Sequence, residues 1–179
     1  MNRVRIIGGA WRSRIITFYP AAGLRPTPDR VRVTLFNWLG QDLSGMACLD
    51  LYAGSGALGF EALSRGAARV VMVERDRRVA QALRDNAARL QAANLEVVVT
   101  DALQFLRSDR RAFDVVFIDP PYRSGILPGI LGELGGHLAP HGRVYAESGE
   151  ALELPPGWMA VRAGRAGAAH YHLLAEAGC

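Results

Sequence analysis

Lysine is absent from this chain of 179 residues, and all 21 of its basic residues are arginine. Cysteine is nearly absent too: Cys48 and Cys179 have no spacing that would indicate a disulfide framework or a metal site. His170 and His172 would share one face of a strand, but we find no third ligand to accompany them. These scarcities lead us to expect no bound metal and a reducing, cytoplasmic environment.

Long apolar runs are also missing. None approaches the roughly 18 residues that a membrane-spanning helix requires, so we expect no membrane partner. The first 14 residues carry arginine at positions 3, 5, 12 and 14 and lack the apolar stretch of a secretory signal. Half of the residues are nevertheless apolar and only 21% are charged, which predicts a folded protein with a substantial core.

Acidic residues are scarce at the beginning of the chain. Residues 1–32 contain seven arginines and one acid, Asp29, a net charge of +6, whereas the remainder has fourteen arginines and sixteen acids, a net charge of −2. A basic segment on a nearly neutral body is typical of proteins that bind phosphate-rich partners, although a solvated basic arm is the plainer alternative. The candidate residues for binding such a partner are Arg12, Arg14, Arg25, Arg30 and Arg32.

The same segment differs in pattern from the rest, so we expect residues 1–44 to form a basic N-terminal extension and residues 45–179 one domain. Two short runs rich in branched residues, 5–7 and 15–17, flank Gly8-Gly9 and predict a β-hairpin. Thr27-Pro28-Asp29 then predicts a helix capped by Thr27 and reaching about Leu39, with Arg30 and Arg32 outside its apolar stripe.

From residue 47 onward, short apolar runs alternate with helical patterns. We expect buried strands at 48–52, 70–73, 97–99, 115–118 and 143–147, and helices at 57–65, 77–91, 102–107 and, more weakly, 126–138. Two further runs, 159–163 and 169–174, predict a terminal hairpin. This order predicts the α/β class: a doubly wound, Rossmann-like sheet, mostly parallel, with a C-terminal antiparallel hairpin.

A glycine-rich turn, Gly54-Ser55-Gly56-Ala57-Leu58-Gly59, follows the first of these strands. Such a turn binds nicotinamide dinucleotides as well as S-adenosylmethionine, so it does not separate the two. Asp50, at the end of the strand, favours S-adenosylmethionine because a carboxylate can bind the cationic amino group of its methionine moiety. Glu74 can accept the ribose hydroxyls, and Asp101 can either accept the adenine amino group or simply cap a helix. The candidate cofactor-binding residues are Asp50, Tyr52, Ala53, Gly54, Ser55, Gly56, Glu74, Arg75, Asp101 and Ala102.

The strand at 115–118 leads directly into Asp119-Pro120-Pro121-Tyr122, which are the candidate catalytic residues. The exocyclic amine of a nucleobase is a weak nucleophile because its lone pair is delocalised into the ring. The Asp119 carboxylate and the Pro120 carbonyl are two acceptors that can hold its N–H groups, and Tyr122 offers a flat face for an unstacked base. No cysteine lies near these residues, which excludes the covalent route to carbon 5 of a pyrimidine and favours direct transfer to nitrogen.

Several stretches together resemble one known family. They are residues 8–12 (Gly-Gly-Ala-Trp-Arg), 24–32, 35–39, 50–59 and 119–122, and they resemble the bacterial 16S ribosomal RNA guanine-N2 methyltransferases, the RsmD type. The resemblance covers most of the chain. It implies a class I methyltransferase sheet with a reversed final strand, S-adenosylmethionine as methyl donor and S-adenosylhomocysteine as product. It also implies 16S ribosomal RNA, within an assembling small subunit, as substrate. We expect a monomer.

Three alternatives remain at this point. An adenine-N6 methyltransferase acting on DNA or RNA uses a closely similar tetrapeptide, often with Asn in place of Asp119. A nicotinamide-dependent oxidoreductase would share the glycine turn but would give Asp119–Tyr122 no role. A non-catalytic RNA-binding module would not need the four acids at the ends of the strands.

Overall fold

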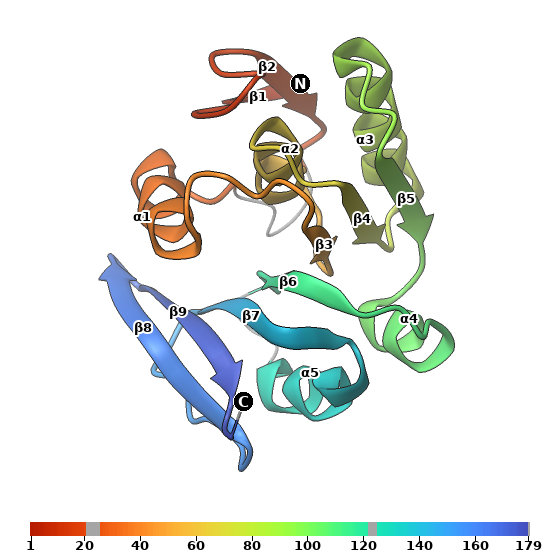
Figure 1. Cartoon of the computed structure of the whole chain (residues 1–179). Coiled ribbons are helices and arrows are strands. Elements are labelled where there is room, and N and C mark those ends of the chain that lie inside the picture. Colours follow the sequence, from red (N-terminus) through yellow and green to blue (C-terminus); the bar gives the residue numbers. More distant parts are fainter. Residues whose placement is uncertain (21–25, 122–124, 179) are drawn as a thin grey trace.

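A single seven-stranded sheet runs through the protein in the computed structural model, which describes residues 1–20, 26–121 and 125–178. Its strands are ordered β5-β4-β3-β6-β7-β9-β8 (Figure 1). The first five of these are mutually parallel, and β9 lies antiparallel between β7 and β8. The predicted doubly wound sheet with a reversed final strand is therefore confirmed.

Strands and helices alternate along the sheet as the apolar runs predict. The strands are β3 (Ala47–Asp50), β4 (Arg69–Glu74), β5 (Leu95–Val99), β6 (Phe113–Ile118), β7 (Leu138–Ser148), β8 (Trp158–Ala166) and β9 (Ala169–Glu176). The helices are α1 (Asp29–Leu39), α2 (Ala57–Ser64), α3 (Arg77–Leu90), α4 (Ala102–Ser108) and α5 (Leu127–Glu133), with a short 3₁₀ turn, η1 (Leu134–Gly136), after α5. Before them, β1 (Asn2–Arg5) and β2 (Ile15–Phe18) pair antiparallel in the expected N-terminal hairpin.

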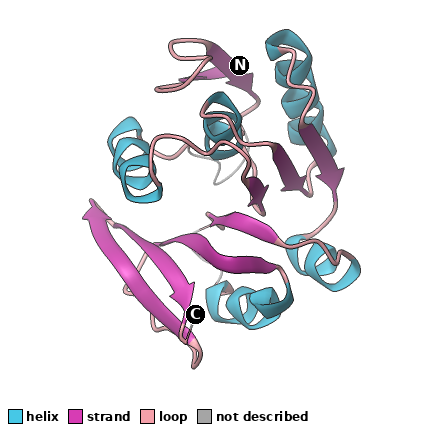
Figure 2. Ribbon diagram, in the orientation of Figure 1, coloured by secondary structure: helices cyan, strands magenta, loops and turns pink. Residues whose placement is uncertain are grey.

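The two faces of the sheet are covered by different helices. The N-terminal hairpin, α1, α2 and α3 lie on one side, and α4 and α5 lie on the other (Figure 2). Alternate residues of each central strand point to opposite faces, so Phe117 packs in the core beneath α1 and α2 while Ile118 packs in the core beneath α4 and α5. The first core also contains Ile16 and Phe36, which shows that the extension and the sheet bury one continuous apolar interior.

Two elements depart from their predicted bounds by five residues, whereas others, such as β1 (Asn2–Arg5, predicted over 5–7), depart by three or fewer. The weak helix predicted over 126–138 ends at Glu133, because glycines at 129, 132, 135 and 136 lower its stability as a helix. The strand predicted from Arg143 begins at Leu138 instead. Its register against β6 shifts between Phe113 and Val115, and His141 has a φ of 63°, so the regular alternation that predicts a strand is broken there.

The expected cap of the first helix is wrong. Helix α1 begins at Asp29 with Pro28, rather than Thr27, as its N-cap residue. The Thr27 hydroxyl donates instead to the carboxylate of Asp119, which lies 92 positions further along the chain. Within the described residues, the structure contains no helix that is both long enough and apolar enough to span a membrane.

Candidate active site

Four acidic residues lie where the parallel strands end. Asp50 and Glu74 are the last residues of β3 and β4, Asp101 follows β5 by two positions, and Asp119 comes directly after β6. These strands are neighbours in the order β5-β4-β3-β6, so the structure brings all four acids to one edge of the sheet. This edge is where open α/β sheets bind their ligands.

The glycine turn connects β3 to α2 at this edge. Gly54 and Gly56 have φ values of 50° and 80°, a region that glycine adopts more readily than other residues, and Gly56 is the N-cap of α2. Gly59 lies one turn inside the helix, and a Cβ there would fall 2.4 Å from Met72 Cε on β4. The helix therefore packs close to the sheet, with its first backbone amides beside the strand ends.

Asp50 is buried, with 2% of its surface exposed. Its Oδ2 accepts a hydrogen bond from the Gly59 N–H at 3.2 Å. Burial raises the pKa of Asp50 to about 7; the Gly59 hydrogen bond opposes the shift and the charge of Glu74 adds to it. A nearby cation stabilises the ionised form of such a buried carboxyl. The position of Asp50 therefore suits the cationic amino group of a methionine moiety.

Glu74 and the glycine turn are joined directly. The Gly54 N–H donates to Glu74 Oε2 at 3.1 Å, and the Asp76 N–H donates to Oε1 at 2.8 Å. Ala53 is also tied to β4, because its N–H donates to the Val73 carbonyl. These two bonds hold the Glu74 carboxylate in a fixed orientation. Each of its oxygens can accept one more hydrogen bond, so the carboxylate can still bind ribose hydroxyls.

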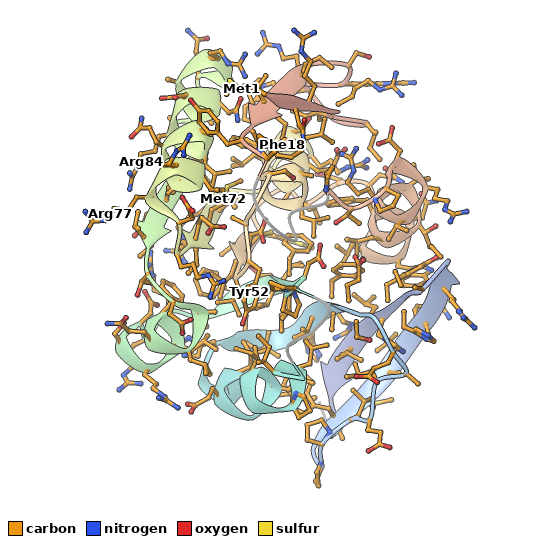
Figure 3. The ribbon with its side chains drawn as sticks, turned by 180° about the vertical axis from the view of Figure 1, so that it is seen from behind. Met1, Phe18, Tyr52, Met72, Arg77 and Arg84 are labelled. Atoms are coloured by element: carbon orange, nitrogen blue, oxygen red, sulfur yellow. The ribbon has the colours of Figure 1, made fainter. Side chains whose placement is uncertain are left out.

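The remaining candidate cofactor-binding residues lie near Glu74 and the glycine turn. Asp101 is exposed and caps α4, with Oδ1 accepting from the Leu103 N–H at 2.9 Å, so its role as a helix cap is shown and its contact with adenine stays a prediction. Tyr52 is half-buried near the middle of the molecule (Figure 3). Burial, with the nearby negative charge of Asp101, raises the pKa of Tyr52 to about 12, and Arg75 opposes that shift. Ser55 and Ala102 are buried in the turn and at the start of α4.

Asp119 is half-buried and connects the sheet to the N-terminal extension. The hydroxyl of Thr27, itself only 5% exposed, donates to Asp119 Oδ2 at 3.2 Å. Burial is the main cause that raises the pKa of Asp119 well above its usual range; the negative charge of Glu147 adds to it, and the Thr27 hydrogen bond opposes it. The raised pKa means that this side chain, which accepts hydrogen bonds when ionised, can hold a proton at the end of a reaction.

A cavity of about 280 Å³ begins at Pro120, the residue after Asp119. Pro120, Pro121 and Glu147, near the end of β7, are among the residues that line it. Tyr122 lies outside the described residues. Within the described part of the chain, no group of three or more His, Cys, Asp or Glu residues is suited to hold a metal ion.

The arginines of the extension do not all lie on the surface. Arg12, Arg14 and Arg30 are exposed, and Arg25 lies outside the described residues. Arg32 was expected to contact RNA, and this expectation is wrong because Arg32 is completely buried. Its guanidinium donates to Glu61 Oε2 at 3.2 Å and to Asp29 Oδ1 at 2.6 Å.

Glu61 is the centre of a buried network that attaches the extension to α2. Besides Arg32, its carboxylate accepts bonds from Arg65 and from the backbone N–H groups of Ile7 and Gly8, at 3.0 Å and 2.7 Å for the two amides. Gly8 allows this approach, because a Cβ at that position would lie 2.3 Å from the Arg65 guanidinium. The basic extension is thus fixed to α2 and to the seven-stranded sheet.

Sequence reasoning missed two residues of the site. Thr27 follows the pattern of a helix cap, so its contact with Asp119, 92 positions away, had no local signal. Glu147 ends the strand predicted over 143–147 and is the residue before the last of β7, and this position near a strand end, which resembles that of Asp50 and Glu74, was the signal that could have identified it.

Comparison with known proteins agrees with this geometry. Residues 4–175 match the model of a family described as Conserved hypothetical protein 95. The chain is 45% identical to the Ribosomal RNA small subunit methyltransferase D of Escherichia coli, over 96% of this chain and 89% of that protein. It is 39% identical to the protein of the same name from Haemophilus influenzae, over 96% and 93%. The solved structure of yhhF from Escherichia coli superposes with a TM-score of 0.88 at 45% identity, covering 98% of each chain. The chain therefore belongs to the ribosomal RNA small subunit methyltransferase D family.

Proposed function

We propose that this protein transfers a methyl group from S-adenosylmethionine to the exocyclic N2 of a guanine in 16S ribosomal RNA. One observation carries the proposal: Asp119 follows the end of β6 and precedes Pro120, which lines a cavity, and it lies at the same edge of the sheet as the strand ends that bear Asp50 and Glu74. The relatives' printed names support a ribosomal RNA of the small subunit as the substrate. We expect the protein to act in the cytoplasm as a monomer.

The residues at the ends of β3 and β4 suit the cofactor. When bound, S-adenosylmethionine supplies an electrophilic methyl group on a sulfonium centre. Asp50 would bind its amino group, Glu74 its ribose hydroxyls, and the backbone of residues 53–56 would surround the methionine portion. Tyr52, Arg75, Asp101 and Ala102 would complete the adenosine side.

Asp119 and Pro120 would hold the amine. With the Asp119 carboxylate accepting one N–H and the Pro120 carbonyl accepting the other, the nitrogen lone pair is turned toward the methyl group. S-adenosylmethionine, when bound, would supply the methyl group to this nitrogen and would leave as S-adenosylhomocysteine. The nitrogen then loses a proton, for which the Asp119 carboxylate is the adjacent acceptor. Tyr122 and Pro121 would support the flipped base.

The exposed arginines of the extension would bind the RNA backbone. Arg12 and Arg14 lie on the hairpin, and Arg30 lies three positions after Thr27, which contacts Asp119. Arg25 belongs to the same stretch of sequence. Phosphate contacts of this kind position an RNA without reading its sequence.

The test is to identify the product. Purified protein is incubated with methyl-labelled S-adenosylmethionine and with 16S ribosomal RNA, either free or in small subunits that lack the modification, and the RNA is digested to nucleosides. The proposal predicts label in N2-methylguanosine at one position. Label in N6-methyladenosine would instead support the alternative adenine activity, which the relatives do not favour. Parallel calorimetry should detect binding of S-adenosylmethionine and none of NAD.

A further inference from the structure

Asp119 and Glu147 are neighbours across the β6–β7 pair. The two strands are parallel, with Phe117 opposite Tyr145 and Ile118 opposite Ala146. Phe117 and Tyr145 face one core, whereas Ile118 and Ala146 face the other. The next position on each strand therefore places the Asp119 and Glu147 side chains together, on the Phe117 face.

Glu147 is held at this place by its own strand. Only 2% of its surface is exposed, yet it lines the cavity beside Pro120 and Pro121. The buried Tyr145 hydroxyl donates to Glu147 Oε2 at 2.9 Å. This bond orients the carboxylate and stabilises its negative charge.

Two carboxylates side by side in a nearly buried site repel each other, and a ligand that provides an N–H donor to each of them would relieve that repulsion. Guanine provides such a pair on adjacent atoms, because its N1–H group stands next to the amine on C2. Adenine and cytosine do not, since in each of them the ring nitrogen beside the amine presents a lone pair. A carboxylate facing that lone pair would repel it.

We propose that Glu147 accepts the N1–H of the target base and so selects guanine among the bases that carry an exocyclic amine. This inference rests on the proposed function, since it assumes that Asp119 holds the guanine N2. Asp119 would receive the amine and Glu147 the adjacent ring N–H. A site built to accept a particular N–H strongly rejects an analogue that lacks it, because the acceptor loses that donor inside a nearly buried site.

The test replaces the target guanosine by 2-aminopurine. This base keeps the amine on C2 but has a lone pair at N1. The probe is 16S ribosomal RNA assembled by ligation, with either base at the position where product mapping finds the methyl group. For the wild-type protein, kcat/KM should be at least about 100-fold higher with guanosine than with 2-aminopurine.

The variant Glu147→Gln should lower that ratio by at least about tenfold, because the amide NH₂ can donate to the N1 lone pair while binding the guanine N–H less well. Comparing ratios removes any contribution from the carbonyl on C6, which 2-aminopurine also lacks. Glu133→Gln is the matched control. Glu133 is exposed on α5 and is not among the residues that line the cavity, so its substitution should leave the ratio at the wild-type value.

Two results would overturn the inference. One is a wild-type ratio near one, which needs no variant and so does not depend on whether Glu147→Gln folds. The other is an unchanged ratio in Glu147→Gln, with its affinity for S-adenosylmethionine intact by calorimetry. Either result leaves the proposed function standing as long as wild-type protein still forms N2-methylguanosine. Absence of that product would refute the proposed function itself.

Discussion

Asp50 links cofactor binding to pH. Its pKa is raised to about 7 by burial, so below pH 7 the side chain is largely protonated and carries little charge. A bound cation favours the ionised form and so releases the proton, which means that binding is weaker at pH values below 7. We expect the affinity for S-adenosylmethionine to rise by up to about tenfold per pH unit from pH 5.5 to 7, and then to level off.

Titration calorimetry in buffers of different ionisation enthalpy checks this directly, because it also counts the protons released on binding. Asp50→Asn should bind more weakly and show little dependence on pH over this range. If the wild-type affinity is flat between pH 5.5 and 7.5, Asp50 is not the partner of the amino group.

Substitution of Thr27 tests the role of Asp119 through the hydrogen bond between them. Its hydrogen bond lowers the pKa of Asp119, against the effects of burial and of Glu147. Thr27→Val removes the donor, so the pKa of Asp119 should rise further and the pH profile of kcat should shift to higher pH. Thr27→Ser keeps a hydroxyl and should restore the wild-type profile. Profiles that coincide for all three proteins would mean that Thr27 only packs against the site.

At the residue scale, the sequence predicts what is local. Asp50, Glu74 and Asp119 each end a short apolar run, so their positions follow from strand patterns alone. Arg32 could not be placed in this way, because its burial depends on Glu61, which lies 29 positions away on another helix. A charged side chain inside a protein needs such a partner. A partner far away in the sequence does not alter the helical periodicity, so the pattern cannot reveal it.

At the scale of elements, the junction between the N-terminal hairpin, α1 and α2 depends on Glu61. Glu61→Ala would leave the guanidinium groups of Arg32 and Arg65 without their shared carboxylate and two backbone N–H groups without an acceptor. Breaking a buried ion pair in this way destabilises a protein by about 3–5 kcal/mol.

Urea denaturation measures this change in the free energy of unfolding. Glu133→Ala is the control, because it removes a similar ion pair, with Arg107, whose side chains are 65% and 39% exposed. That substitution should cost about 1 kcal/mol or less. Equal losses in the two variants would show that the Glu61 network does not hold the extension in place.

Element boundaries followed the sequence where the pattern was regular and departed from it where backbone geometry broke the pattern. Helix α3 lies within one residue of its prediction, because its apolar stripe is continuous from Val79 to Leu90. Strand β7 begins five residues early, across a register shift that no alternation of residues reveals.

At the scale of the whole molecule, the charged extension and the sheet share one core, so the extension is placed rigidly relative to the active site. The division at residues 44 and 45 stays a prediction about function. If the extension binds RNA, replacing Arg12, Arg14 and Arg30 by Gln should weaken RNA binding. It should also flatten the slope of log affinity against log salt by up to about 0.7 per lost contact to a single strand.

The matched control replaces Arg77, Arg84 and Arg110 by Gln. These arginines are exposed, and their replacement removes the same amount of positive charge. Arg77 and Arg84 point outward from α3, away from α1 (Figure 3). Affinity for S-adenosylmethionine should be unchanged in both proteins. Equal salt slopes for the two triple variants would mean that the extension contributes only general positive charge.

The central claim is that Asp119 directs methyl transfer to guanine N2 in 16S ribosomal RNA. The most direct measurement is the N2-methylguanosine content of 16S ribosomal RNA, by mass spectrometry of nucleosides, in cells that lack this gene and are supplied with either the wild-type protein or Asp119→Ala. We predict that one N2-methylguanosine is missing without the gene and returns with the wild-type protein. It should stay missing with Asp119→Ala, although that variant still binds S-adenosylmethionine within a few-fold of wild type. Full methylation in cells without the gene, or its restoration by Asp119→Ala, would contradict the account.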